Sequence, residues 1–338
     1  MYYANNDLRI QKMPTPKIGK GELLVRIHAS GICGSDVMEW YRAGRVPLVL
    51  GHEIGAEIVD VGAGPCARPY KKGQRITAAH HVPCNKCHFC KLGHHTTCET
   101  LRKTNFDPGG FAEYCRLAPI NVGRGVLMLP DNVSYEEATF VEPLACILRG
   151  QRIAGITKGN SVFVIGSGVT GCLHIKLAKL SGAFFILATD VVDYRVKFAK
   201  KSGANIALNA KDYSPDIFKQ KNKGLLADIV IVCSGAIPAI NQAIESVERG
   251  GTILFFAPTA QNASVTMPFN KLFWRNEITL TSSYAGSPDD HKEALKLISK
   301  GKINVKDMIT HRLPLDKISE GFKLVAEAGE SMKVIIKP

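Results

Sequence analysis

Apolar positions in the second half of the chain follow two alternating patterns. From about residue 159, short runs rich in Val, Ile and Phe alternate with stretches in which apolar residues recur at helical spacing. This alternation predicts an α/β domain with a doubly wound parallel sheet, in which helices cover both faces. We expect strands at 161–165, 184–189, 228–233 and 251–257, and helices at 170–181 and 193–202.

Before residue 159 the pattern changes, because frequent Gly and Pro break the chain into short pieces. Strand-like stretches at 22–29, 55–61 and 74–77 predict a mostly β domain of partly barrel-like form. A helical stretch near 290–299 and a strand near 333–336 follow the α/β region, and we expect this tail to return to the first domain. The expected boundaries are 1–148 for the β-rich domain, 149–284 for the α/β domain and 285–338 for the returning segment.

Composition and charge exclude some classes of function. The formal net charge of +13 comes from lysines and arginines interleaved with acids, so we expect no nucleic-acid partner. Apolar runs such as 183–188 fall far short of the ~20 residues that a membrane span needs, so we expect no membrane partner either. No secretory signal is visible and most cysteines are scattered singly, which indicates a reducing, cytoplasmic setting.

Four cysteines form the most distinctive polar motif. Cys84, Cys87, Cys90 and Cys98 follow the spacing Cys-x2-Cys-x2-Cys-x7-Cys within the short segment 84–98. The spacing predicts a closed tetrahedral zinc site, because two-residue gaps let successive thiolates surround one ion and the longer gap lets the chain return. Two disulfides are the alternative, and a reducing setting argues against them. Four thiolates leave no open position for a substrate, so this zinc is expected to be structural.

A glycine-rich loop follows the first predicted strand of the α/β domain. Gly166, Gly168 and Gly171 form a Gly-x-Gly-x-x-Gly string between a strand and a helix, and Asp190 ends the next strand 19 residues after Gly171. This context indicates a dinucleotide-binding Rossmann domain. Asp190 can accept hydrogen bonds from the adenosine ribose and repels the extra phosphate of NADP, so NAD is the expected cofactor. The residues expected to bind it are Gly166, Gly168, Val169, Thr170, Gly171, Asp190 and Arg195, although an exposed helix position would explain Arg195 equally well.

Three short motifs carry side chains suited to a catalytic metal. Cys33 and Ser35 lie in Gly-Ile-Cys-Gly-Ser-Asp, His52 and Glu53 in Gly-His-Glu, and Glu142 in Val-Glu-Pro-Leu. A lone buried Cys or His is usually a packing residue. Beside a nicotinamide-type domain and a structural zinc site, however, a thiolate, an imidazole and a carboxylate match an open zinc site with three protein ligands.

Taken together in their order along the chain, these motifs make the chain resemble the zinc-dependent medium-chain dehydrogenases. Within that family it resembles the polyol and threonine dehydrogenase branch. The resemblance covers essentially the full length and implies a GroES-like catalytic domain, a Rossmann coenzyme domain, two zinc ions per subunit and a homotetramer or homodimer. It also implies that Cys33 and His52 bind the catalytic zinc, that Asp36 orients His52, and that Ser35 hydrogen-bonds the substrate oxygen. The implied reaction transfers a hydride between a secondary alcohol (a polyol, sugar or hydroxy amino acid) and NAD, and gives the ketone.

The third ligand of the catalytic zinc stays open. Simple alcohol dehydrogenases of this family have a cysteine where the chain has Glu142, so Glu142 binds zinc directly or holds its water, and Glu53 can do the same from the other side. Relatives often place a proton-passing histidine at the position of Met38, and methionine cannot carry a proton. Arg42 and Arg45 leave a phosphorylated polyol open as substrate. The alternative functions are an NADP-preferring simple alcohol or ketone reductase, and an inactive zinc-stabilised dinucleotide-binding protein.

Overall fold

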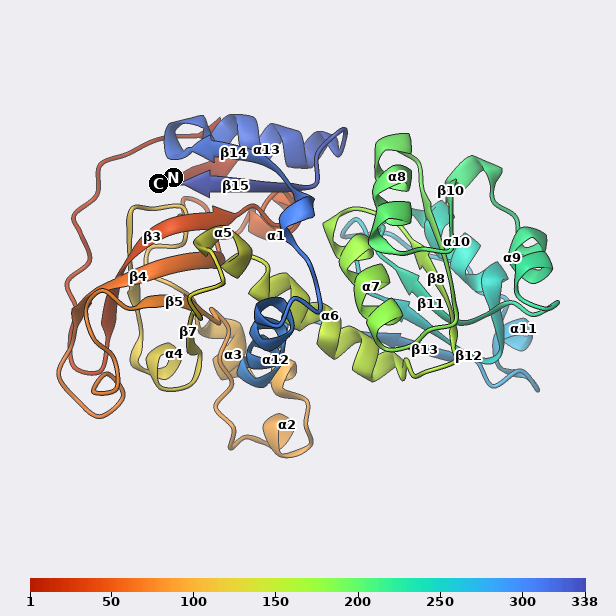
Figure 1. Cartoon of the computed structure of the whole chain (residues 1–338), viewed down its shortest axis with the longest axis horizontal. Coiled ribbons are helices and arrows are strands. Elements are labelled where there is room, and N and C mark those ends of the chain that lie inside the picture. The colour runs from red at the N-terminus through yellow and green to blue at the C-terminus, as the bar shows by residue number, and fades with distance from the viewer. The chain divides into compact units, whose positions relative to one another are not determined.

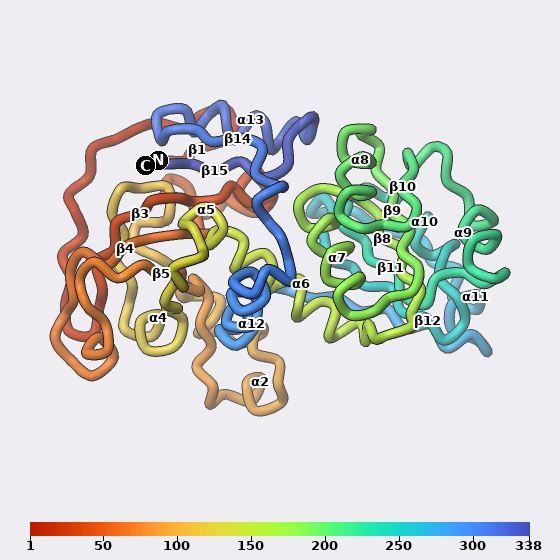
Figure 2. The backbone as a smooth tube through the Cα atoms, viewed as in Figure 1, coloured from red at the N-terminus to blue at the C-terminus, as the bar shows by residue number.

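The computed structural model describes residues 1–338, which divide into two units. Unit 1 comprises Met1–Cys146 and Ala285–Pro338, and unit 2 comprises Ile147–Tyr284. Figures 1 and 2 trace both units, with the blue C-terminal segment lying beside the red N-terminal strands. Helix α6 (Val141–Ala154) contains the first boundary between the units. No helix in the chain combines the length and the apolar character that a membrane span requires.

Unit 1 is built on a seven-stranded sheet in the order β14-β15-β3-β4-β5-β7, with β6 also paired to β3. Strand β3 (Leu23–Gly31) runs antiparallel to both β4 (Glu53–Val61) and β15 (Lys333–Lys337), and Figure 1 shows these strands side by side. Alternate side chains of β3 are buried in one core cluster. A second cluster forms where β15 packs against α13 (Ile318–Glu327). The sheet thereby joins a strand from the end of the sequence to two from its beginning.

The remaining elements of unit 1 are short. They are β1 (Tyr2–Ala4), β2 (Asp7–Leu8), α1 (Glu39–Arg42), β5 (Arg75–Ala78), α2 (His88–Lys91), α3 (Glu99–Lys103), β6 (Tyr114–Leu117), α4 (Pro119–Arg124), β7 (Val126–Met128), α5 (Tyr135–Ala138), α12 (Pro288–Ser299) and β14 (Ile309–Pro314).

Unit 2 holds a six-stranded sheet in the order β10-β9-β8-β11-β12-β13, and all its strand pairs are parallel. Every residue of β8 (Ser161–Ile165) and β9 (Phe185–Asp190) is buried, because helices cover both faces of the sheet. Successive residues of β8 accordingly belong to different core clusters: Phe163 packs on one face and Val162 on the other.

The remaining elements of unit 2 are α7 (Val169–Leu180), α8 (Asp193–Ser202), β10 (Ile206–Asn209), α9 (Pro215–Lys221), β11 (Ala227–Val232), α10 (Ile237–Ser246), β12 (Val247–Phe255), α11 (Phe269–Phe273) and β13 (Thr279–Ser282).

The predicted fold class is confirmed, and the predicted strand at 161–165 and helix at 193–202 coincide with β8 and α8. Two strands of unit 2 were not predicted. Neither β10 nor β13 contains a buried residue, so neither shows the apolar run that signals a parallel strand. Both lie at the edges of the sheet.

Candidate functional site

A buried ion pair lies at the centre of the motif cluster in unit 1. Lys333 Nζ donates to Glu53 Oε2, and both side chains are 1% exposed. Gly31 is the register partner of Glu53 in β4 and of Ile335 in β15, so it lies between the strands that bring the two charges. A Cβ atom at Gly31 would collide with both Glu53 and Lys333. The missing side chain at Gly31 therefore provides the space in which the ion pair forms.

Burial dominates the electrostatics of Glu53. It raises the pKa of Glu53 to about 7, even though the Lys333 ammonium group lowers it. A carboxylate that is taken out of water needs a counter-charge or hydrogen-bond donors to remain ionised. Lys333 supplies that counter-charge at one of the two carboxylate oxygens.

A tight turn after β3 positions the Cys-Gly-Ser-Asp motif. The Asp36 N–H donates to the Cys33 carbonyl oxygen, and the Cys33 N–H donates to Asp36 Oδ2, both at 3.0 Å. The Ser35 N–H and hydroxyl both donate to Cys33 Sγ, at 3.5 and 3.4 Å. Donors aimed at the sulfur suit a thiolate that binds a metal.

Asp36 is fully buried and contacts two cationic side chains. Its Oδ1 lies 3.6 Å from His52 Nδ1 and 3.4 Å from Arg42 Nη2. Burial lowers the pKa of His52, but the Asp36 carboxylate and the Cys33 sulfur outweigh it, so the pKa of His52 lies well above its ordinary value. Arg42 also donates to the Ser35 carbonyl oxygen at 3.2 and 3.1 Å and is 9% exposed. The Arg42 guanidinium group is therefore already bonded within the protein, which argues against Arg42 as a ligand of a substrate phosphate.

Cys33, His52 and Glu53 come together as one set of metal donors. One ligand atom from each of these residues lies within 4.8 Å of the others. Glu142 lies outside this set, in the first turn of α6, where its Oε1 accepts from the Cys146 thiol at 3.4 Å. One sulfur, one nitrogen and one oxygen donor match the ligand preference of Zn²⁺, and three protein ligands leave one position for a substrate.

The four cysteines of the lobe at 84–98 also converge, and none of them forms a disulfide. The Sγ of Cys90 lies 4.0 Å from that of Cys84 and 3.5 Å from that of Cys87. A tetrahedral Zn–S₄ site with Zn–S bonds of about 2.3 Å has S···S distances of about 3.8 Å, so the sulfurs fit one zinc ion.

The thiols of this lobe do not ionise alike. Backbone N–H groups of Lys86 and Cys87 lower the pKa of Cys84. Burial raises the pKa of Cys98, but N–H donors outweigh it and lower that pKa to about 6, whereas burial raises the pKa of Cys90 to about 12. A bound metal ion would hold all four as thiolates.

The glycine-rich loop in unit 2 has the form that a phosphate group needs. Gly166 adopts φ +91°, and a Cβ at Gly171 would collide with the Gly166 carbonyl oxygen. Gly168 is the N-cap of α7, and no side chain caps this helix, so its first N–H groups are available to a pyrophosphate. Arg195 on α8 places a guanidinium nitrogen 3.6 Å from the position that a Cβ of Gly168 would take. Val169 and Thr170 form the first turn between these glycines.

Asp190 ends β9 beside this loop and is 7% exposed. Its Oδ2 accepts from the Ser167 N–H at 2.7 Å and its Oδ1 from the Val192 N–H at 2.9 Å. A carboxylate has about four lone-pair sites, so two remain for the hydroxyl groups of a ribose. The two backbone bonds fix the orientation of the carboxylate toward the loop.

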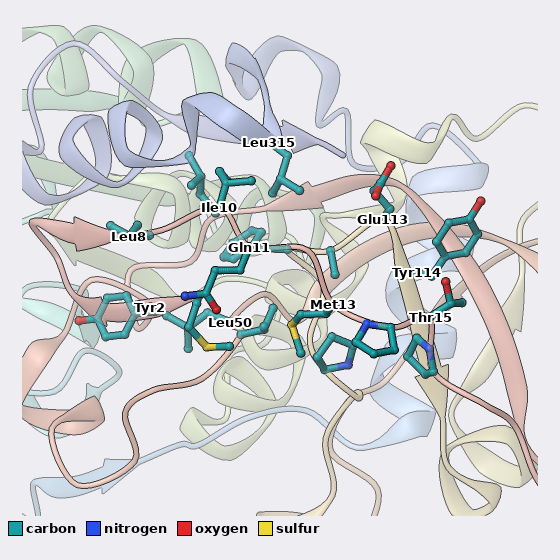
Figure 3. A pocket seen from close by; sticks show the side chains of 18 of the residues that line it. Tyr2, Leu8, Ile10, Gln11, Met13, Thr15, Leu50, Glu113, Tyr114 and Leu315 are labelled. Atoms are coloured by element: carbon teal, nitrogen blue, oxygen red, sulfur yellow. The ribbon is translucent and has the colours of Figure 1, made fainter.

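A separate cavity of about 170 Å³ lies in unit 1. Figure 3 shows apolar side chains around it, among them Ile10, Met13, Leu50 and Leu315, together with the polar Gln11. None of the metal-donor residues lines this cavity.

Comparison with known proteins identifies the family. Residues 19–127 match the alcohol dehydrogenase GroES-like domain, and residues 169–300 match the zinc-binding dehydrogenase family. Sorbitol dehydrogenase from Gallus gallus is 32% identical over 98% of this chain and 93% of its own length. The chain therefore belongs to the zinc-binding, medium-chain dehydrogenases, in the polyol dehydrogenase branch. It is an oxidoreductase that acts on small-molecule alcohols, with zinc and a nicotinamide nucleotide as cofactors.

Solved structures agree with this assignment. A protein from Sinorhizobium meliloti 1021, described as a zinc-binding dehydrogenase and bound to NADP, is 26% identical with a TM-score of 0.86, over 99% of this chain and 97% of its own. The alcohol dehydrogenase TADH from Thermus sp. ATN1 is 25% identical with a TM-score of 0.83, over 99% and 98% of the two chains.

Sequence reasoning missed the part that Lys333 plays. The residue was recognised only as the start of a predicted strand, and 280 positions separate it from Glu53. A lysine at the start of an otherwise apolar strand, whose first four residues are all buried in the structure, is the one local signal that could have singled it out.

Replacing Lys333 by methionine should lower the free energy of unfolding by about 3–5 kcal/mol, because Glu53 would stay buried without its counter-charge. Urea unfolding measures the change. The double variant Glu53→Gln with Lys333→Met should recover much of the loss, since it removes both charges together.

Lys337→Met is the matched control for Lys333→Met. Lys337 lies on the same strand, but its side chain is 49% exposed in its ion pair with Glu136, so this substitution should change the free energy of unfolding by at most about 1 kcal/mol. Equal losses from the two lysine substitutions would show that burial of the Glu53–Lys333 pair is unimportant.

Proposed function

We propose that the chain oxidises a secondary hydroxyl group of a polyol with NAD, at a zinc ion held by Cys33, His52 and Glu53. The observation that carries this proposal is the convergence of these three donors within 4.8 Å. A carboxylate as third ligand separates this site from the simple alcohol dehydrogenases, which carry a cysteine at the position of Glu142. Similarity to a sorbitol dehydrogenase supports a polyol as substrate.

The proposed roles follow from the contacts of each side chain. When bound, zinc would lower the pKa of the substrate hydroxyl group and NAD would accept the hydride. The Ser35 hydroxyl lies beside the donor set, 3.4 Å from Cys33 Sγ, and can hydrogen-bond the substrate oxygen. Asp36 holds the His52 ring through Nδ1, which leaves Nε2 for the metal. Lys333 occupies one oxygen of Glu53 and leaves the other free to bind zinc.

Glu142 would act next to this set rather than within it. Its charge raises the pKa of both His52 and Glu53, although burial and other neighbours act more strongly on each. A carboxylate within electrostatic reach of the donors can hold the fourth zinc ligand or replace Glu53 when a substrate enters. The Cys146 thiol, which donates to Glu142, holds that carboxylate in place.

In this proposal unit 1 is the GroES-like catalytic domain, with a structural zinc at Cys84, Cys87, Cys90 and Cys98. Unit 2 is the NAD-binding domain, with Gly166, Gly168, Val169, Thr170, Gly171, Asp190 and Arg195 as its contacts. Ten free cysteines support a cytoplasmic location.

We further propose that the chain forms a homodimer or homotetramer. Strand β13 is an edge strand with unpaired backbone groups on one side. Phe269 and Trp274, in the segment before it, are 70% and 72% exposed. Exposed aromatic side chains beside an open sheet edge are typical of a surface that pairs with another copy.

Protein purified with zinc available should contain two zinc ions per chain and should reduce NAD when polyols are supplied. A panel of polyols, sugars, threonine and simple alcohols, followed by the absorbance of the reduced nicotinamide, tests the activity, and metal analysis tests the zinc content. Reduction of NAD by simple alcohols alone, or a single zinc ion per chain, would contradict the proposal.

Glu53→Gln and Glu142→Gln form a matched pair of isosteric substitutions that identifies the third ligand. Glu53→Gln should lower kcat by orders of magnitude and reduce the zinc content from two ions to one, because an amide is a poor zinc ligand. Glu142→Gln should lower kcat but keep both ions. The four-cysteine site should keep its zinc in both variants, and the opposite ranking would assign the third ligand to Glu142.

Asp190→Ser tests the choice of cofactor. The unsubstituted enzyme should use NAD with a much higher kcat/KM than NADP, because the buried Asp190 carboxylate would lie beside the extra phosphate. The substitution should reduce the ratio of kcat/KM for NAD to that for NADP by at least about tenfold. Removing the repulsion between the Asp190 carboxylate and the extra phosphate of NADP is worth more than about 1.4 kcal/mol. An unsubstituted enzyme that already prefers NADP would show that Arg195, rather than Asp190, decides the choice.

A further inference from the structure

His291 in α12 carries a buried nitrogen with no partner in the protein. The residue is 1% exposed, and its Nδ1 lies 2.9 Å from the Ser287 carbonyl oxygen. A carbonyl oxygen only accepts, so Nδ1 carries the proton and Nε2 presents a lone pair. No group of the chain donates to this Nε2. A buried acceptor without a donor costs about 1–3 kcal/mol, so a donor from outside the chain would stabilise this nitrogen.

One close contact places the start of α12, the helix of His291, beside α6. A capping box between Ser287 and Asp290 fixes the start of α12. The preceding Gly286 packs so closely on α6 that a Cβ there would lie 2.8 Å from the Cβ of Ala145. Ala145 is three residues after Glu142, so the beginning of α12 lies against the turn of α6 that carries this carboxylate.

The electrostatic interactions of His291 agree with this position. Burial lowers the pKa of His291 and the Glu142 carboxylate raises it, which places the two groups within reach of each other. His291 in turn acts on His80, whose ring centroid lies 4.7 Å from that of His52. His80 Nδ1 is also buried without a partner. Two imidazole rings with unused nitrogens thus interact with the donor set or with Glu142: His80 packs on His52, and His291 lies within electrostatic reach of Glu142.

We propose that His291 determines substrate specificity: its Nε2 accepts a hydrogen bond from a second hydroxyl group of the substrate, next to the one that is oxidised. This inference rests on the proposed function and adds the residue that would recognise a second, neighbouring hydroxyl group of the polyol. A site built to bond a hydroxyl group discriminates strongly against an analogue that lacks it, because the buried partner is then left unsatisfied. The same acceptor offers nothing to a simple secondary alcohol, which has no second donor.

Two substitutions separate this role from a structural one. Asparagine at position 291 places an amide nitrogen near the position of Nδ1 and can keep the bond to Ser287, but has no atom at the position of Nε2. Glutamine reaches the position of Nε2 with its amide oxygen and loses the bond to Ser287. Butane-2,3-diol and butan-2-ol are the matched substrates, since they differ only in the second hydroxyl group.

We expect His291→Asn to lower kcat/KM for the diol relative to butan-2-ol by roughly tenfold or more, mainly through KM. His291→Gln should keep most of the preference for the diol. Calorimetric titration of the zinc-loaded protein with the diol gives a second readout that needs no turnover, and it should show weaker binding only for His291→Asn. A larger loss in His291→Gln than in His291→Asn would overturn the inference, because it would assign the effect to the Ser287 bond.

His174→Asn is the matched control. His174 is also fully buried with a partnerless Nε2, but it lies on α7 in unit 2, where Gln151 contacts its Nδ1 at 3.2 Å. This substitution should leave the ratio between diol and butan-2-ol unchanged. An unchanged ratio in His291→Asn as well would overturn the inference while the proposed function stands. If the unsubstituted protein oxidised neither compound nor any other polyol, the proposed function would fail and the inference with it.

Discussion

The site in unit 1 depends on the burial of one carboxylate and one ammonium group together. Glu53 and Lys333 are both 1% exposed, and neither could remain charged there alone. Their pairing requires β4 and β15 to flank β3 in a fixed register, and it requires a residue without a side chain at Gly31, where the strands meet. A shift of one residue in either strand would turn one of the charges toward the opposite face of the sheet. The register of these three strands therefore also fixes the position of Glu53 in the donor set.

Charge balance around the donors explains why the carboxylates have different surroundings. Glu53 faces an ammonium group, Asp36 is shared by an imidazole and a guanidinium group, and Glu142 accepts a hydrogen bond from a neutral thiol. The first two are held in fixed positions by ionic partners. Glu142 has a weaker partner, because a thiol is a poor donor, and its carboxylate is the one that can most easily change position. The arrangement gives one anchored carboxylate and one adaptable carboxylate beside the same metal donors.

Local patterns in the sequence predicted much of this structure. The helix at 193–202, the strand at 161–165 and the convergence of the four lobe cysteines each depend on residues close together in the chain, and each was found from spacing alone. The family and the class of enzyme were predicted from the order of the motifs, and the comparisons confirm both. The individual ligands and cofactor contacts stay predictions until metal and nucleotide binding are measured.

Features that depend on distant contacts could not be predicted in this way. In the structure Glu53 rather than Glu142 lies with Cys33 and His52, and sequence spacing contains no information on these distances. The charge of Arg42 left a phosphorylated substrate open, whereas the fold turns this side chain inward onto the Ser35 carbonyl oxygen. The unused nitrogen of His291 is equally invisible in the sequence, since it follows from the direction of one hydrogen bond.

The separation of Glu53 from Lys333 along the chain has a consequence for biosynthesis. The ribosome must add 280 residues, including all of unit 2, before the counter-charge of Glu53 exists. The four-cysteine lobe is complete within 15 residues of its first cysteine, so it can capture zinc while translation continues. The donor set at Cys33 and His52 cannot reach its final form until β15 has been made and has paired with β3. The order of the residues along the chain thus separates the maturation of the two metal sites in time. A nascent chain can be stabilised by the four-cysteine site well before its catalytic site is complete.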